Sequence, residues 1–216
     1  MTASTFMLRS SLALAALFAI AVPAFAQNTP PAAPSTPPAS AAPTAAPAVD
    51  MVAGLAAWDD IYKVFSHPRC ANCHSPDDQP RWSGPHYGAT RVHAFNVQRG
   101  IDGSGFGNTG MRCTACHFET NSPVMHGPPG ADNWHLAPIE MAWFDQTSAQ
   151  ICAQIKDPAR NGDRTLEEVA QHIRTDKLVH WGWAPGPGRE PAPGSADETY
   201  AAIEKWAAAG APCPAQ

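Results

Sequence analysis

The sequence predicts a small, mainly α-helical domain with extensive loops and few or no strands. The chain has 23 prolines and 16 glycines among 216 residues, and both residue types resist regular helix and sheet. Apolar residues recur at helical spacing over residues 51–65 and in the last third of the chain, whereas residues 66–147 show no sustained period. We therefore expect the middle of the domain to be held by something other than secondary structure.

The first 26 residues have the pattern of an export signal. Arg9 precedes the apolar run Leu12–Val22, which is too short to cross a bilayer comfortably. Ala24-Phe25-Ala26 resembles a cleavage site. This pattern predicts a periplasmic protein in an oxidising compartment, where cysteines form disulfides or thioether links. The alternative is an uncleaved membrane anchor, which would tether the protein.

Residues 27–49 form a predicted linker, and residues 50–216 form the predicted domain. The linker contains seven prolines and no charged residue, a composition typical of an extended, semi-rigid spacer. It is either a tether or a tail without a role. The net charge of −5 excludes the basic surface that nucleic-acid binding requires.

Four helices are expected within the domain. The first covers residues 51–65 and ends before Pro68. The second covers residues 148–156. Capping boxes at Thr165 and Ser195 predict the starts of the other two, which end near Thr175 and Gly210.

Two motifs of the form CxxCH carry the chemistry of the sequence. They are Cys70-Ala71-Asn72-Cys73-His74 and Cys113-Thr114-Ala115-Cys116-His117. This motif is the attachment site of c-type haem. In each motif the two thiols bond to one porphyrin, and the histidine that follows ligates its iron. The thiols belong to Cys70 and Cys73 in the first motif and to Cys113 and Cys116 in the second. The iron ligands are His74 and His117. The sequence therefore predicts two covalently attached haems.

Two other chemistries use similar cysteine pairs. A zinc ribbon places its two pairs about 15–20 residues apart, and here Cys73 and Cys113 are farther apart than that. A thioredoxin-type thiol pair opens a helix within a βαβ unit, and no strand pattern surrounds either motif. Both alternatives fit less well than haem.

The remaining histidines and methionines supply candidates for the second axial ligand of each iron. We favour His93, in a stretch of alternating apolar residues, and His135, in an apolar segment where a buried histidine needs a partner. Weaker candidates are His172, His67 and Met141.

Arg69 and Arg112 each precede the first cysteine of a motif. They are candidates to pair with haem propionates, although both would equally suit a solvated surface. The seven tryptophans of the chain suit the walls of haem sites better than a substrate site.

Cys152 and Cys213 belong to no CxxC pair. In an oxidising compartment we expect them to form a disulfide that holds the C-terminus. Two unpaired buried thiols are the alternative.

The domain resembles a group of exported dihaem c-type cytochromes that often bear the label of an isoquinoline 1-oxidoreductase-type subunit. The resemblance runs from about residue 57 to residue 215, and the segments His67–His74, Trp134–Pro138, Leu178–Trp183 and Gly210–Pro214 carry it. The label implies a partner to a molybdenum hydroxylase, but no segment here suits molybdopterin or flavin. The sequence between the motifs is also similar to the dihaem subunit of periplasmic nitrate reductase, in which histidines supply both distal ligands.

These observations predict a periplasmic dihaem cytochrome c that carries single electrons between redox partners, such as a periplasmic or membrane dehydrogenase. We expect an electron-transfer protein with no transmembrane helix after signal cleavage and no catalytic residue. A dihaem peroxidase or oxidase is the alternative. It requires an open iron and nearby acid–base groups, which the sequence does not place beside either motif. A haem-based ligand sensor ranks last.

Overall fold

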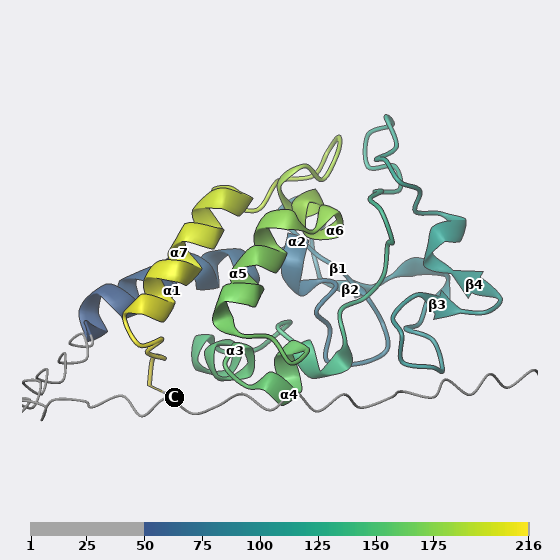
Figure 1. The fold of residues 1–216 in the computed structure, drawn as a ribbon. Coiled ribbons are helices and arrows are strands. Elements are labelled where there is room, and N and C mark those ends of the chain that lie inside the picture. The colour runs from purple at the N-terminus through teal and green to yellow at the C-terminus, as the bar shows by residue number, and fades with distance from the viewer. Residues whose placement is uncertain (1–49, 216) are drawn as a thin grey trace, which may run out of the picture. The chain divides into compact units, whose positions relative to one another are not determined.

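The computed structural model describes residues 50–215 (Figure 1). The predicted export signal and linker lie outside these residues. Helices account for 42% of the described residues and strands for 5%, which confirms a mainly helical fold with extensive loops. No helix in this part of the chain is both long enough and apolar enough to cross a membrane.

Residues 50–215 form α-helices, short 3₁₀ turns and four short strands. The α-helices are α1 (Met51–Phe65), α2 (Pro68–Ala71), α3 (Ser148–Ile155), α4 (Pro158–Asn161), α5 (Leu166–Thr175), α6 (Lys177–His180) and α7 (Ala196–Ala208). The 3₁₀ turns are η1 (Ala94–Asn96), η2 (Cys113–Ala115), η3 (Ile139–Met141) and η4 (Trp181–Trp183). The strands are β1 (Arg81–Trp82), β2 (Arg91–Val92), β3 (Gly107–Asn108) and β4 (Met111–Arg112).

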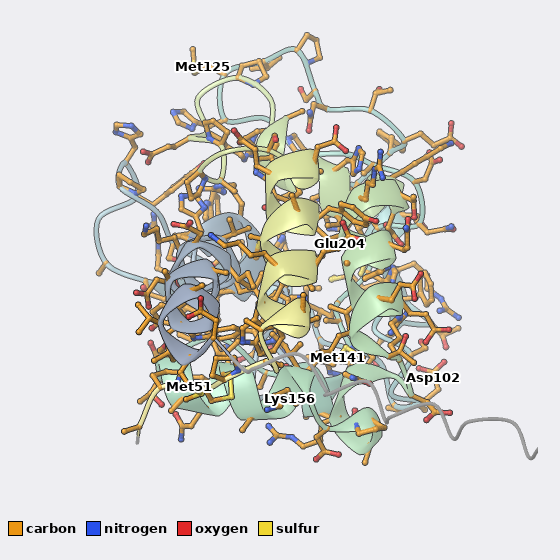
Figure 2. The ribbon with its side chains drawn as sticks, turned by 60° about the vertical axis from the view of Figure 1, so that its left-hand side comes forward. Met51, Asp102, Met125, Met141, Lys156 and Glu204 are labelled. Atoms are coloured by element: carbon orange, nitrogen blue, oxygen red, sulfur yellow. A yellow bond between two sulfur atoms is a disulfide. The ribbon has the colours of Figure 1, made fainter. Side chains whose placement is uncertain are left out.

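The core lies where α7 packs against both α1 and α5 (Figures 1 and 2). Trp58 of α1 and Trp206 of α7 are fully buried, and their ring centres are 5.0 Å apart. Each indole nitrogen keeps a partner on burial. Trp58 donates to Ser148 Oγ and Trp206 donates to the carbonyl of Pro212, both at 2.8 Å. The two tryptophans therefore bury a large apolar area without leaving an unpaired donor.

The helix starts follow the capping residues seen in the sequence. Thr165 accepts a hydrogen bond from the backbone N–H of Glu168, and the Glu168 side chain accepts one from the backbone N–H of Thr165. Ser195 accepts from the N–H of Glu198 at 3.1 Å. Gly210 has a φ of 83°, the left-handed conformation that favours glycine after a helix. The predicted bounds of all four helices are confirmed to within one or two residues.

The C-terminal segment is attached to α3. The structure joins Cys152, buried in α3, to Cys213, with Cα atoms 5.7 Å apart. Nearby, Lys156 donates from Nζ to the carbonyl of Ala211 at 2.7 Å. These contacts hold the C-terminal segment against α3.

Residues 66–147 contain two small antiparallel sheets, each made of two strands of two residues. β1 pairs antiparallel with β2, with Arg81 opposite Val92, and β3 pairs antiparallel with β4, with Gly107 opposite Arg112. Strands this short leave no alternation in the sequence, so pattern analysis cannot locate them. Each motif begins on a single helical turn, α2 or η2.

Arg99 links the loops of this region. Its side chain is 2% exposed. It donates to the carbonyl of Asp77 at 3.2 Å and to the carbonyl of Ala137. The backbone N–H of Arg99 donates to the carbonyl of Asp78, and its own carbonyl accepts from Gly107. Through its side chain and its backbone together, this one residue connects the segment after the first motif, the segment of His135 and the hairpin before the second motif.

Removing the link between the C-terminus and α3 should destabilise the domain. We expect the double substitution Cys152→Ala and Cys213→Ala to lower the free energy of unfolding by about 2–5 kcal/mol, because the cross-link restricts the unfolded chain. Denaturant titration of the two proteins measures the difference. A reductant should destabilise the natural protein and leave the variant unchanged. Alkylation of both thiols without reductant would contradict this disulfide.

Candidate functional site

The first motif begins on α2, shortly after α1, and continues past the end of that helix. His67 accepts a hydrogen bond at Nδ1 from the N–H of Arg69 and so caps α2, and Pro68 occupies the first turn, where its missing N–H costs nothing. Cys70 and Cys73 form no disulfide and line a cavity of about 400 Å³. Burial raises the pKa of Cys70 to about 12 and that of Cys73 to about 11. Both thiols are therefore protonated, unlike the thiolate of a reactive redox pair.

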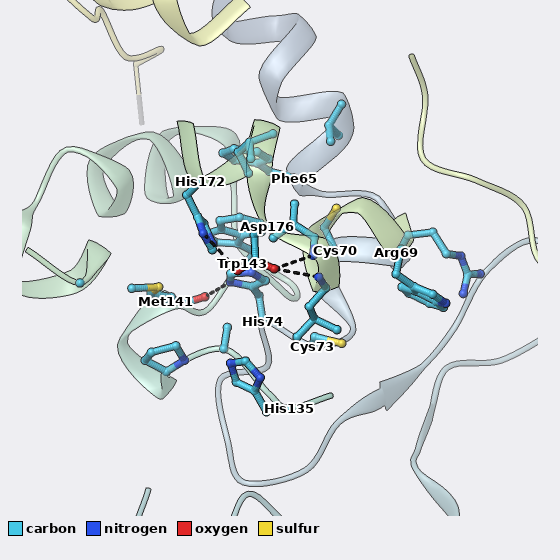
Figure 3. Close-up of a pocket in the computed structure, with 18 of the residues that line it drawn as sticks. Phe65, Arg69, Cys70, Cys73, His74, His135, Met141, Trp143, His172 and Asp176 are labelled. Carbon is cyan, nitrogen blue, oxygen red and sulfur yellow. Dashed lines mark hydrogen bonds and ion pairs between the residues drawn. The ribbon is translucent and has the colours of Figure 1, made fainter. Parts of the chain in front are cut away.

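His74 is fixed in position and tautomer (Figure 3). Its Nδ1 lies 2.7 Å from the carbonyl of Met141, which can only accept, so Nδ1 carries the proton. Its ring stacks on Trp143 with centres 3.5 Å apart and planes within 1°. Phe65 also stacks on Trp143, with ring centres 4.3 Å apart. Burial lowers the pKa of His74 to about 4, so the imidazole is neutral and Nε2 presents a lone pair.

Three of the predicted ligand candidates share the cavity of the first motif. Figure 3 shows His135, His172 and Met141 around His74. His135 contacts the carbonyl of Asn133 through Nδ1. The side chain of Met141 lines the cavity, while its carbonyl orients His74. His67, which caps α2, is not among the residues that line the cavity.

Acid–base groups also line this cavity. His172 Nδ1 lies 3.6 Å from a carboxylate oxygen of Asp176, and both residues, with Arg164, contribute to the walls. Burial lowers the pKa of His172, and Asp176 partly opposes this effect. The expectation that no acid–base group lies beside either motif is wrong for the first, because α5 brings distant residues to it.

Arg69 is a buried cation at the edge of the same cavity. It is 6% exposed, and its Nε has no hydrogen-bond partner within residues 50–215. One terminal nitrogen lies 3.4 Å from the carbonyl of Ser83, and the guanidinium lies about 6 Å from the rings of Tyr87 and Trp181. Burial lowers its pKa. A buried charge without a carboxylate partner is costly, so the site suits an anionic group in the cavity.

The second motif lies on η2, directly after β4. His117 is 9% exposed, and its Nδ1 lies 2.8 Å from the carbonyl of Pro129. Its ring stacks on Trp134, with centres 4.6 Å apart and planes within 2°. Burial lowers the pKa of His117. The second motif histidine is therefore held in the same way as the first, by a carbonyl at Nδ1 and a tryptophan on its face.

His93 faces the second motif. Its ring centre is 5.9 Å from that of His117, and its Nδ1 lies 2.8 Å from the carbonyl of Ala94. The two imidazole rings meet edge to face, with planes at 62°. His93 and His135 are thus divided between the two motifs, one histidine to each.

The second motif is more exposed than the first. Cys116 and Arg112 are exposed, and Cys113 is half-buried. Phe95 and Phe118, which are close in sequence to His93 and His117, expose 79% and 69% of their surface. Large apolar side chains near the motif residues suit an apolar cofactor that covers them.

The two motifs are neighbours in space. Cys113 lies close enough to Cys73 to raise its pKa through like-charge repulsion. Trp134, which stacks on His117, also lines the cavity of Cys70 and His74. The two motifs therefore lie close together within the described domain.

The residues present fit two c-type haems. Each motif offers two thiols outside any disulfide. Four histidines, His74, His93, His117 and His135, have Nδ1 at a backbone carbonyl and no partner for Nε2 within residues 50–215. No group of three or more His, Cys, Asp or Glu side chains in this range is arranged around a metal position. A haem iron takes only axial ligands from the protein, because the porphyrin supplies the others.

Three residues have roles in the structure that could not be predicted from the sequence. Trp134 and Trp143 face the motif histidines, and only their residue type had suggested haem walls. Arg99 was missed entirely, because a single arginine in a loop has no distinguishing pattern. The position of Trp134, directly before the candidate ligand His135, is the one signal that could have identified it.

Comparisons with known proteins add no relative. The chain matches no protein-family model, and neither the curated proteins nor the solved structures contain a significant match.

Proposed function

We propose that the chain is a periplasmic dihaem c-type cytochrome that carries single electrons between redox partners. The observation that carries the proposal is the matched environment of the two motifs. At each one, a CxxCH histidine is held at Nδ1 by a backbone carbonyl and stacked on a tryptophan, with Nε2 available. Fixing Nδ1 is how proteins orient a metal-binding imidazole and increase its basicity.

At the first site, Cys70 and Cys73 would attach the haem and His74 would bind its iron, with His135 as the second axial ligand. Arg69 supplies the buried positive charge for a propionate. When bound, the haem supplies reversible one-electron chemistry. The protein contributes orientation through the Met141 carbonyl and exclusion of water through the aromatic walls.

At the second site, Cys113 and Cys116 would attach the haem, with His117 and His93 as axial ligands. Arg112 is exposed and available to a propionate at the surface. The greater exposure of this site favours it as the point of exchange with a partner protein, because surface groups there can come close to that partner.

A dihaem peroxidase or oxidase is the second candidate, and one observation favours it. His172, Asp176 and Arg164 line the cavity of the first motif, where they could move protons at a reacting ligand. Such an enzyme needs an iron with an open position. His135 lines the same cavity with Nε2 available, so it would occupy the open position of that iron. We therefore favour the electron carrier over the enzyme.

Haem attachment is the direct test of the proposal. Expressed with a haem-maturation system, the protein should stay coloured through denaturing electrophoresis and contain two haems per chain, because thioether bonds survive denaturation. Cys113→Ala with Cys116→Ala, or Cys70→Ala with Cys73→Ala, should each leave one haem. A colourless, zinc-containing product would refute the proposal.

The axial ligands can be tested one at a time. We expect both irons to be low-spin, and His93→Ala or His135→Ala should each make one iron high-spin, as seen in the absorption and electron paramagnetic resonance spectra. His180→Ala is the control, because His180 Nε2 already contacts the carbonyl of Arg174 at 2.6 Å. Unchanged spectra in the His135 variant would move the ligand assignment to His172 or Met141.

Electron transfer should depend on salt. Loss of Arg9 with the signal makes the net charge one unit more negative than −5, and haem propionates add further negative charge. A basic acceptor protein should therefore oxidise the reduced protein more slowly as ionic strength rises, whereas a neutral acceptor should not. Peroxide turnover at the level of a dedicated peroxidase, lost in His172→Ala, would instead support the enzyme.

A further inference from the structure

Trp134 contacts both motifs. Its ring stacks on His117 of the second motif, and its side chain lines the cavity of Cys70, Cys73 and His74. It is 9% exposed. It also directly precedes His135, the candidate ligand in the first cavity.

A second set of contacts runs along the same path. Trp181, another wall of the first cavity, meets Trp134 edge to face, with ring centres 4.9 Å apart and planes at 84°. Trp181 donates to Asn121 Oδ1 at 3.0 Å, and the N–H of Gly130 donates to the same oxygen. Gly130 follows Pro129, whose carbonyl holds His117. The wall of the first cavity therefore supports both the face and the Nδ1 contact of His117.

Trp143 provides the contrast. It stacks on His74, but its other contacts lead into the helical core. Phe65 packs on it, and its Nε1 donates to Gln154 Oε1 at 2.6 Å. Trp143 thus supports the first site alone, whereas Trp134 belongs to both.

We propose that Trp134 is a positioning residue shared by the two haem sites and that it couples their electronic properties. This inference rests on the proposed function. The stack fixes the plane of the His117 imidazole. The same indole lines the first cavity, and the backbone of Trp134 continues directly into His135, whose ring also stacks on Phe106 with centres 4.6 Å apart. A change in this one side chain should therefore alter the surroundings of both irons. A residue with contacts at only one site would alter one iron alone.

The test uses the full chain with both haems attached and reads the oxidised protein by electron paramagnetic resonance. The His93→Ala and His135→Ala variants assign the two low-spin signals to their irons. Trp134→Leu keeps apolar bulk and removes the ring, and Trp134→Phe keeps a smaller ring. We expect both signals to shift in both variants, with the smaller shift in Trp134→Phe, and both midpoint potentials to move as well.

Trp143→Phe is the matched control and should shift only the signal of the His74 iron. The inference is overturned if either Trp134 variant leaves one of the two signals at its original position. If Trp134→Leu cannot be purified with two haems, Trp134→Phe alone tests the inference, because both of its low-spin signals are expected to shift. A natural protein with fewer than two haems would instead refute the proposed function.

Discussion

Each motif histidine is held at Nδ1 by a backbone carbonyl, and the arrangement of the loops depends on these two hydrogen bonds. The Met141 carbonyl that contacts His74 lies 67 residues away in the chain, and the Pro129 carbonyl that contacts His117 lies 12 residues away. Each bond selects one tautomer and leaves Nε2 for a metal. The loops must follow paths that bring those carbonyls into place.

The helical part of the domain provides the rigid side of this arrangement. The packing of α7 against α5, and of α5 against α6, positions part of the first cavity. His172 of α5, Val179 of α6 and Asp176 between the two helices line it. Phe65, at the end of α1, supports Trp143 and through it His74. The first motif therefore packs against the helical core, whereas the second packs against loops. This difference agrees with the greater exposure of the second motif.

Two buried arginines show how the loop region balances its charges. Arg99 donates to two carbonyls and lies 3.8 Å from a carboxylate oxygen of Asp78. Within residues 50–215 no carboxylate forms an ion pair with Arg69, which lines the edge of the first cavity, although Glu190 acts on its pKa from a greater distance. The Nε of both arginines lacks a hydrogen-bond partner within residues 50–215, but Arg99 has the nearby carboxylate of Asp78. Because burying an unpaired charge is expensive, Arg99 fits a structural link, whereas Arg69 fits a site that an anionic group completes.

Features that depend on neighbouring residues could be predicted from the sequence. Capping boxes act over three residues, so Thr165 and Ser195 located helix starts, and the CxxCH spacing identified thiols and a histidine within one turn of chain. Only the tertiary structure assigned His135 to the first motif and His93 to the second, and brought His172 with Asp176 to the cavity. Those contacts join segments without periodicity across long stretches of chain, and the position of Trp134 between the motifs follows from packing that no local pattern records.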